Sequence, residues 1–217
     1  MNDSDPIAVI ETLYSAVVAD VLDSMGHRNQ ILSADIHALT PSEKVCGRIF
    51  TAKCQTISET PDEPYKLEME AIDTMKKGDV FVVDAGYDRT CGLWGELLTT
   101  ACIAKGVRGI VMSACSRDLW ALNQLDFPVF GIGKHPGDSM GRADISVIGQ
   151  PIEIDGVAAK NGDFILGDLD GVVIIPQECA DEALRLAAEK VAGENVVRNE
   201  LAAGASVSAV FKKHGIL

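Results

Sequence analysis

Two short apolar runs, Asp79-Val-Phe-Val-Val-Asp84 and Arg108-Gly-Ile-Val-Met-Ser113, decide the fold of this chain, and a helical segment from Trp94 to Lys105 separates them. Apolar runs of this length predict strands buried inside a sheet. Further along, Arg117 to Leu125 has the composition of a short helix, and Pro128 to Ile132 that of a third strand. Strands that alternate with helices predict parallel neighbours joined by right-handed crossovers. The centre of the chain therefore predicts an α/β sheet.

The segment before this centre is expected to add two helices and a strand. We expect a first helix over residues 5–26, with Asp5 as its N-cap, Pro6 in its first turn and Gly26 after its end. Residues 45–54 are predicted to form a strand, and residues 65–77 a helix with apolar side chains at helical spacing.

The segment after Gly133 has short alternating runs separated by turns. We expect a hairpin turn at Asp170-Gly171, and an alanine-rich helix over residues 178–203 that ends at Gly204. Four strands are expected before that helix, at residues 144–148, 152–154, 164–167 and 171–175. The whole chain, residues 1–217, is predicted to be one α/β domain with a layer of additional strands and a C-terminal helical arm.

The charge balance limits the partners of this protein. Its 217 residues include 19 Lys and Arg against 32 Asp and Glu, a formal net charge of -13. Nucleic acids and anionic membranes are bound by clustered basic residues, so we expect neither as a partner. The segment Met1–Pro6 lacks the basic and apolar parts of a signal peptide, and no apolar run approaches the roughly 18 residues of a membrane span. We predict a cytoplasmic protein whose six cysteines are reduced.

Several common site motifs are missing. The four histidines lack zinc-binding spacing, and the sequence has no nucleophile elbow, phosphate-binding loop or dinucleotide-binding glycine motif. We therefore expect no nucleotide cofactor and no methyl donor. Cys115 has no histidine near it in sequence, so we interpret it as a small buried side chain and not as a nucleophile.

The ends of the two central strands carry the strongest candidate site, because ligands of open α/β sheets bind beyond the carboxyl ends of parallel strands. A loop is expected after Asp84, over residues 85–94, and it leads to Gly95 and Glu96 at a predicted helix start, where free backbone N–H groups suit an anion. The next strand leads to Arg117, which can clamp a carboxylate, and to Asp118, which offers an oxygen ligand to a cation such as Mg²⁺.

Each of these residues also has an ordinary structural interpretation. Glu96 would be a favourable charge in the first turn of a helix. Arg117 and Asp118 would form a surface ion pair worth roughly 0–1 kcal/mol. Residue types and spacing alone slightly favour the structural interpretation, and the functional one depends on the resemblance that follows.

A set of segments spanning nearly the whole chain carries a family resemblance. The most specific is Trp94-Gly-Glu-Leu-Leu98 followed by Arg117-Asp118. The others are Tyr14–Asp20, Gly78–Asp84, Gly106–Val111, Phe127–Phe130, Gly162–Asp163, Asp170–Pro176 and Gly204–Val207. Together they resemble the RraA-like family, which includes the class II 4-hydroxy-4-methyl-2-oxoglutarate / 4-carboxy-4-hydroxy-2-oxoadipate aldolases and the regulator of ribonuclease E activity A.

This resemblance implies a β/β/α swivelling-domain fold assembled as a homotrimer or homohexamer, with the C-terminal helix packed on a neighbouring subunit. It implies that Asp118 binds Mg²⁺ or Mn²⁺ and that Glu96 holds a water on that metal. Glu194 is the best match to a glutamate that reaches the metal through water from the neighbouring subunit.

The resemblance also implies how a substrate is held. Arg117 would hold a pyruvyl group, and the backbone amides of Leu97 and Leu98, after Gly95, would take its carboxylate. One departure is that Ser113-Ala114 stands where many members have Asp-Gly. The metal and substrate residues are intact, but the pocket floor is changed, so the substrate can differ from the two named acids.

The activity implied is a metal-dependent cleavage of 4-hydroxy-2-oxo acids to pyruvate and a second oxo acid, with oxaloacetate decarboxylation as a side activity of the same enolate chemistry. The alternative is a non-catalytic, RraA-type regulator that binds a ribonuclease, and an acidic surface would suit a basic partner segment. A third label attached to similar sequences, demethylmenaquinone methyltransferase, has no support because a methyl-donor loop is missing.

Overall fold

A computed structural model describes residues 5–215 of the chain. Residues 1–4, part of the stretch considered above for a signal peptide, lie outside the described residues, as do residues 216–217. The helices are α1 (Pro6–Ile10), α2 (Ser15–Ser24), α3 (Lys66–Thr74), α4 (Glu96–Lys105), α5 (Leu119–Leu122), η1 (Gln177–Cys179), α6 (Ala180–Ala202) and α7 (Val207–His214). The strands are β1 (His37–Ala38), β2 (Val45–Thr56), β3 (Asp79–Trp94), β4 (Ile110–Ser116), β5 (Val129–Gly131), β6 (Gly133–Lys134), β7 (Ala143–Ile148), β8 (Ile152–Ile154), β9 (Val157–Ala159), β10 (Phe164–Gly167) and β11 (Val172–Ile175).

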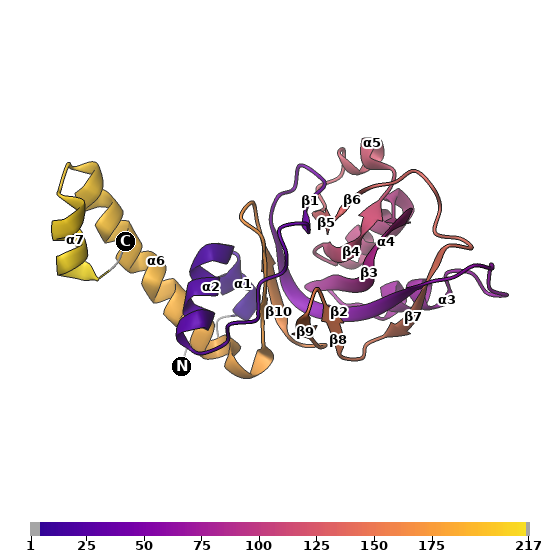
Figure 1. Ribbon diagram of the computed structural model, residues 1–217, viewed down its shortest axis with the longest axis horizontal. Coiled ribbons are helices and arrows are strands. Elements are labelled where there is room, and N and C mark those ends of the chain that lie inside the picture. The colour runs from indigo at the N-terminus through magenta and orange to yellow at the C-terminus, as the bar shows by residue number, and fades with distance from the viewer. Residues whose placement is uncertain (1–4, 216–217) are drawn as a thin grey trace.

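A nine-stranded mixed sheet forms the body of the molecule (Figure 1). Its central strands β2, β3, β4 and β5 run parallel to one another in that order. The antiparallel strands β7 and β10 pair with β2, and β11 extends the sheet beyond β10. Strands β8 and β9 form a separate hairpin. The prediction of an α/β sheet with parallel central strands is confirmed.

Three groups of buried apolar side chains hold the layers together. One lies between the sheet and helices α3 to α5, and includes Phe81 and Trp94. A second lies on the opposite face, where the β8–β9 hairpin covers side chains such as Val82 and Val111. The third joins α1, α2 and the first turns of α6 to β10 and β11. The rest of α6 then leaves the body and carries α7 at its far end (Figure 1).

Several local predictions are confirmed. Asp5 caps α1 by accepting a hydrogen bond from the backbone N–H of Ile7 at 3.1 Å. Gly106 ends α4 with a φ of 75°, a left-handed conformation that glycine adopts at low cost. Asp170 and Gly171 form the turn of the β10–β11 hairpin, and α6 fills most of the helix predicted over residues 178–203.

The prediction of one helix over residues 5–26 is wrong, because two helices occupy that segment. Helix α1 ends at Ile10, and the chain is extended at Tyr14, with φ -129° and ψ 155°. Asp168, from the β10–β11 hairpin, then accepts hydrogen bonds from the backbone N–H and the hydroxyl of Ser15, at 2.7 and 2.6 Å. A distant carboxylate therefore caps α2, where Tyr14 offers no side-chain cap.

Two other boundaries differ from the predictions. The segment after Asp84, expected to be a loop, continues β3 to Trp94 with register shifts against β4, because the end of β4 supplies its hydrogen-bond partners. The helix expected over residues 117–125 is only the short α5. Strands β1, β6 and β9 and helix α7 were not predicted. None of the helices in the described part of the chain combines the length and the apolar character that crossing a bilayer would need.

The cap at Ser15 gives a first testable prediction. Ser15 is 3% exposed, so Asp168→Ala would leave its buried N–H and hydroxyl unsatisfied. We expect this variant to lose about 1–3 kcal/mol of unfolding free energy in urea denaturation. Asp170→Ala, in the same turn, is the matched control and should cost less than about 0.5 kcal/mol. Equal losses for the two variants would contradict the role of Asp168 as the cap.

Candidate active site

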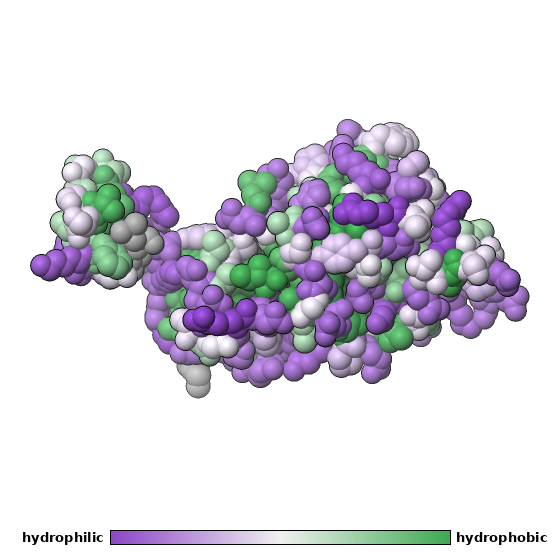
Figure 2. All heavy atoms as spheres, in the orientation of Figure 1, coloured by the Kyte–Doolittle hydropathy of each residue, from purple (hydrophilic) through white to green (hydrophobic). Residues whose placement is uncertain are grey.

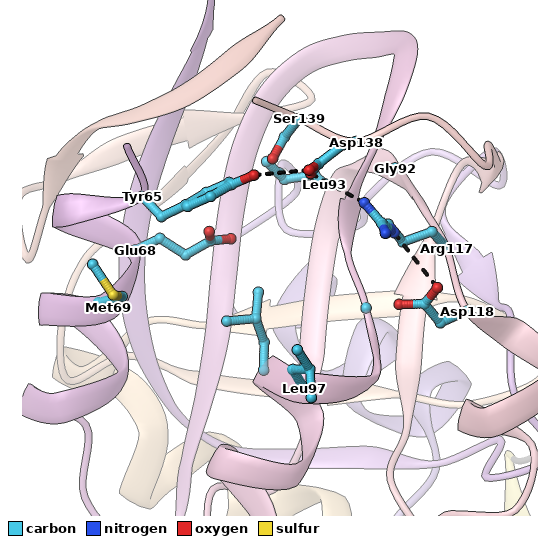
Figure 3. Close-up of a pocket in the computed structure, with 12 residues that line it drawn as sticks. Tyr65, Glu68, Met69, Gly92, Leu93, Leu97, Arg117, Asp118, Asp138 and Ser139 are labelled. Carbon is cyan, nitrogen blue, oxygen red and sulfur yellow. Dashed lines mark hydrogen bonds and ion pairs between the residues drawn. The ribbon is translucent and has the colours of Figure 1, made fainter. Parts of the chain in front are cut away.

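A cavity of about 300 Å³ lies where β3 and β4 end, between α3 and the start of α4 (Figure 3). Its wall combines apolar side chains with four that carry acidic or basic groups. The lining residues are Tyr65, Glu68, Met69, Gly92, Leu93, Gly95, Leu97, Leu98, Arg117, Asp118, Asp138 and Ser139. A concave, mainly apolar pocket with a few convergent polar groups is the usual form of a small-molecule site.

Hydrogen bonds between the ends of β3 and β4 set the position of Arg117 and Asp118. The carbonyl oxygen of Trp94 accepts from the backbone N–H of Arg117 at 2.8 Å and from the Ser116 hydroxyl at 2.9 Å. Asp118 follows with a φ of 58°, a left-handed conformation that is uncommon for residues other than glycine. Its Oδ2 accepts from the backbone N–H of Glu96 at 3.3 Å, so the carboxylate lies against the first turn of α4.

Gly95 makes room for that carboxylate. A Cβ added to Gly95 would lie 2.5 Å from Oδ2 of Asp118 and 3.2 Å from Cγ of Arg117. Its φ of -148° is open to any residue, so the constraint is space and not backbone conformation. Any larger residue at this position would push the Asp118 carboxylate away from the start of α4.

Arg117 is held between two carboxylates. Its Nη1 lies 3.0 Å from Oδ1 of Asp138, and its Nε lies 3.5 Å from Oδ1 of Asp118. The other oxygen of Asp138 accepts a hydrogen bond from the Tyr65 hydroxyl at 2.9 Å (Figure 3). Burial and this hydrogen bond raise the pKa of Tyr65 to about 12, so the hydroxyl stays protonated near neutral pH.

The start of α4 is suited to an anion. Gly95 is the N-cap and has no side chain, and Leu97 and Leu98 follow in the first turn. Backbone N–H groups in a first helical turn have no carbonyl partner within the helix. With the positive end of the helix dipole, they favour a carboxylate or phosphate. The Leu97 side chain is 79% exposed, so its packing does not hold the first turn of α4 in place.

Glu68 brings a buried carboxyl group to the same pocket. It lies on α3 and is only 5% exposed. Figure 3 shows its carboxyl group pointing from α3 into the space below the Tyr65 ring. Burial, together with the charges of Asp144 and Asp138, raises the pKa of Glu68 to about 8. Glu68 is therefore mainly a neutral carboxylic acid at pH 7.

The structure brings five of the predicted site residues together in the pocket wall: Gly95, Leu97, Leu98, Arg117 and Asp118. Glu96 adjoins them through its backbone, but its side chain accepts a hydrogen bond from the Thr100 hydroxyl at 3.0 Å and is not part of the wall. Glu194 lies on α6 and accepts a hydrogen bond from Tyr14 of the same chain.

Four polar residues of the pocket were not predicted from the sequence: Tyr65, Glu68, Asp138 and Ser139. Asp138 lies in a connection between strands and belongs to no motif. Glu68 is one of several acidic residues on α3, but it lies three, four and seven residues before the buried Ala71, Ile72 and Met75, and this helical spacing is the signal that places it on the buried face. The basic residues Arg89, Lys134 and His135 do not line the pocket. Cys91 and Cys115 are buried elsewhere in the core, and burial raises the pKa of both thiols.

The donor set fits a hard divalent cation that keeps most of its water. Within residues 5–215, no group of three or more His, Cys, Asp or Glu side chains forms a metal cage. Asp118 presents its carboxylate in the space that the absence of a side chain at Gly95 leaves open, and Mg²⁺ is commonly held by one or two carboxylates plus waters. Arg117 is flanked by two carboxylates, so the pocket would have surplus negative charge without a cation.

Comparisons with known proteins agree on one family. The family model RraA-like (Aldolase/RraA) matches residues 15–174. A protein of Halalkalibacterium halodurans, provisionally named 4-hydroxy-4-methyl-2-oxoglutarate aldolase, is 30% identical over 88% of this chain and 85% of its own length. Protein DlpA of Legionella pneumophila is 28% identical over 82% of this chain, which spans only 29% of that protein.

A solved structure shares the fold. Streptomyces coelicolor RraAS2, described as an unusual member of the RNase ES inhibitor RraA protein family, superposes with a TM-score of 0.81. The alignment covers 92% of this chain and all of that one, at 26% identity. The predicted RraA-like fold with a C-terminal helix is confirmed.

The environment of Glu68 gives a second prediction, on stability. Its pKa in the folded protein, about 8, lies above the usual value of 4.5, so the folded state retains a proton that the unfolded state loses. The stability of the wild type should therefore fall as pH rises from about 4.5 to about 8, by up to about 1.4 kcal/mol per pH unit from this group.

Glu68→Gln removes this titration, so its stability advantage over the wild type should grow across that pH range. The measurement is urea denaturation at several pH values, with Glu70→Gln on the exposed face of α3 as control. Parallel pH curves for wild type and Glu68→Gln would show that the carboxyl is not buried as described.

Proposed function

The chain belongs to the RraA-like family, and we propose that it is a lyase: a divalent-metal-dependent class II aldolase that cleaves 4-hydroxy-2-oxo acids to pyruvate and a second oxo acid. The observation that carries this proposal is the convergence of Arg117, Asp118 and the first turn of α4 on one small pocket. The relatives named as 4-hydroxy-4-methyl-2-oxoglutarate aldolases support the same reaction class.

The pyruvyl half of the substrate would be held by Arg117 and the start of α4. Arg117 presents a planar group that can bind a carboxylate through two hydrogen bonds. The N–H groups of Leu97 and Leu98 supply further donors from a rigid helix. For this, Arg117 must exchange part of its contact with Asp138, whose other oxygen remains bonded to Tyr65. The substrate would therefore enter a pocket whose donors are already oriented.

Asp118 would hold Mg²⁺ or Mn²⁺, and such a cation supplies Lewis-acid stabilisation of the negative charge that develops on the 2-oxo group during cleavage. Arg117 adds a second positive charge beside the same atoms. Glu96, at the start of α4, is the carboxylate that would accept the proton of the C4 hydroxyl through a water molecule. The same stabilised enolate would form on loss of CO₂ from oxaloacetate, so decarboxylation is proposed as a side activity.

We propose that the chain is one domain and acts as a homotrimer or homohexamer. The support is the arm formed by α6 and α7, which projects from the body (Figure 1). Figure 2 shows hydrophobic side chains gathered on the lobe that contains α7. Val196, Val207 and Phe211 on this arm are each at least half exposed. Packing the arm on a neighbour would bury this apolar surface and would carry Glu194 towards that neighbour's site.

A ribonuclease-binding regulator is the second candidate function. Two observations favour it: the net charge of -13 and the similarity to RraAS2. A pull-down with a basic ribonuclease scaffold segment, run beside a pyruvate-release assay, separates the two functions. The intact pocket supports the enzyme, since a surface that only binds a protein does not need Arg117, Asp118 and a helix start around one cavity.

The central prediction concerns Asp118. We expect the wild type to release pyruvate from one or more 4-hydroxy-2-oxo acids with Mg²⁺ or Mn²⁺, and to lose this activity in EDTA. Asp118→Asn should lower kcat/KM by about 100-fold or more, because it removes the carboxylate that holds the cation. Asp73→Asn, on the exposed side of α3, should leave the rate unchanged. Metal-dependent cleavage retained by Asp118→Asn would refute the assignment.

A mixing experiment tests the shared site. Asp118→Asn and Glu194→Gln should each be impaired, because each lacks one half of the site. After the two variants are unfolded together and refolded at equal amounts, about a quarter of the sites should combine both intact halves, and activity should return to that extent. No recovery, although mixed oligomers form, would show that Glu194 acts within its own chain or not at all.

A further inference from the structure

Glu68 is the one acidic side chain of the pocket wall that the proposed steps leave without a task. The other two, Asp118 and Asp138, are already paired with Arg117. The carboxyl group of Glu68 has no hydrogen-bond partner among the described residues and points into the cavity from the opposite helix, α3 (Figure 3). The Glu68 oxygens are not among the buried side-chain atoms of the described residues that lack both solvent and a hydrogen-bond partner, so the carboxyl group faces the open space of the cavity, where a ligand can reach it.

The groups around Glu68 keep it protonated. Asp138 and Asp144 face it from the connection before β7 and from β7 itself, and both oppose its ionisation. The remaining titratable neighbours are neutral near pH 7: the Tyr65 hydroxyl and the thiols of Cys54 and Cys102 all have pKa values raised to about 12. No described cation acts on Glu68, since Arg117 is taken up by Asp118 and Asp138.

The proposed reaction needs a proton donor inside this pocket. When the C3–C4 bond of the substrate breaks, its electron pair stays on C3, C4 becomes a carbonyl carbon, and the hydroxyl proton leaves to a base. The enolate becomes pyruvate only when C3 takes up a proton. A positioned carboxylic acid with a pKa near the working pH is suited to that transfer.

We propose that Glu68 is this acid and donates its proton to C3 of the pyruvate enolate. The proposal rests on the proposed function. The carboxylate left after the transfer regains a proton from solvent, so one proton leaves the substrate hydroxyl and one enters C3 in each turnover. Run backwards, the Glu68 carboxylate removes a proton from the methyl group of pyruvate.

The reverse step gives a direct test. Wild-type protein with Mg²⁺ or Mn²⁺ in D₂O should exchange the methyl protons of pyruvate for deuterium, which NMR follows without any acceptor. Glu68→Gln keeps the shape and neutrality of the protonated acid but cannot transfer a proton. We expect the exchange rate to fall about 100-fold or more, within the range for loss of a general acid or base. Glu70 lies two residues further along α3 and is exposed, so Glu70→Gln should exchange pyruvate protons at the wild-type rate.

The pH dependence adds a signature that a purely structural role would not produce. Cleavage uses the acid form of Glu68 and should decline as pH rises through about 8, whereas methyl exchange uses the carboxylate and should increase over the same range. Both of these pH dependences should disappear in Glu68→Gln. Glu68→Asp retains the acid one methylene further back and should recover part of the exchange.

The outcomes separate the two proposals. In one outcome, the wild type cleaves substrate and exchanges the methyl protons of pyruvate, and Glu68→Gln exchanges them as fast as the wild type. Glu68 is then not the proton donor, and the aldolase assignment stands. If the wild type neither releases pyruvate nor exchanges it, the proposed function fails, and this inference fails with it. Pyruvate binding to Glu68→Gln, measured by calorimetry, should match the wild type; a lost binding signal with lost exchange would assign Glu68 to substrate binding and overturn the proton-donor role.

Discussion

The carbonyl oxygen of Trp94, at the end of β3, accepts two hydrogen bonds from the end of β4, and the candidate site depends on this junction. Through the N–H of Arg117 and the hydroxyl of Ser116, it fixes the separation of the two strand ends. Asp118 then meets the first turn of α4 through the N–H of Glu96, and the bare Gly95 leaves space for it. A cation ligand, an arginine and a helix start are thus positioned by backbone contacts inside a rigid sheet.

The three carboxyl groups of the pocket differ because their surroundings differ. Asp138 is held by an arginine and a tyrosine hydroxyl, and Asp118 by an arginine and a backbone N–H. In both cases the carboxyl oxygens meet hydrogen-bond donors. Glu68 is buried, meets only other acids and neutral groups, and so keeps its proton. One small cavity therefore combines charged oxygen ligands with a neutral acid, which is the division of roles that acid–base chemistry needs.

The acidity of the whole molecule does not contradict an anionic substrate. A net charge of -13 spread over the surface is screened within about 8–10 Å at physiological salt. Inside the cavity, Arg117, the start of α4 and a divalent cation would act at contact distance, where they outweigh the distant charges. The same overall charge would speed the approach of a basic protein partner, and this is why a regulator remains the alternative to test.

The sequence by itself determined what depends on neighbouring residues. Apolar runs and helical spacing predicted β3, α4, β4 and β5 in the right order, Gly106 predicted the end of α4, and Asp170-Gly171 predicted a hairpin turn. Local order along the chain also placed Gly95, Leu97, Leu98, Arg117 and Asp118 at one edge of the sheet. The family followed from the same segments.

Only the tertiary structure decided features that depend on partners far along the chain. Asp168 caps α2, which local spacing alone predicted as one helix with α1. The end of β4 pairs with residues that were expected to form a loop, and these residues form the second half of β3. Burial of Glu68 and the contact of Asp138 with Arg117 require α3, β4 and the connection before β7 to meet around one cavity. Helical spacing shows which face of α3 is apolar, but the pKa of a carboxyl group depends on the charges and the solvent that the completed fold leaves around it.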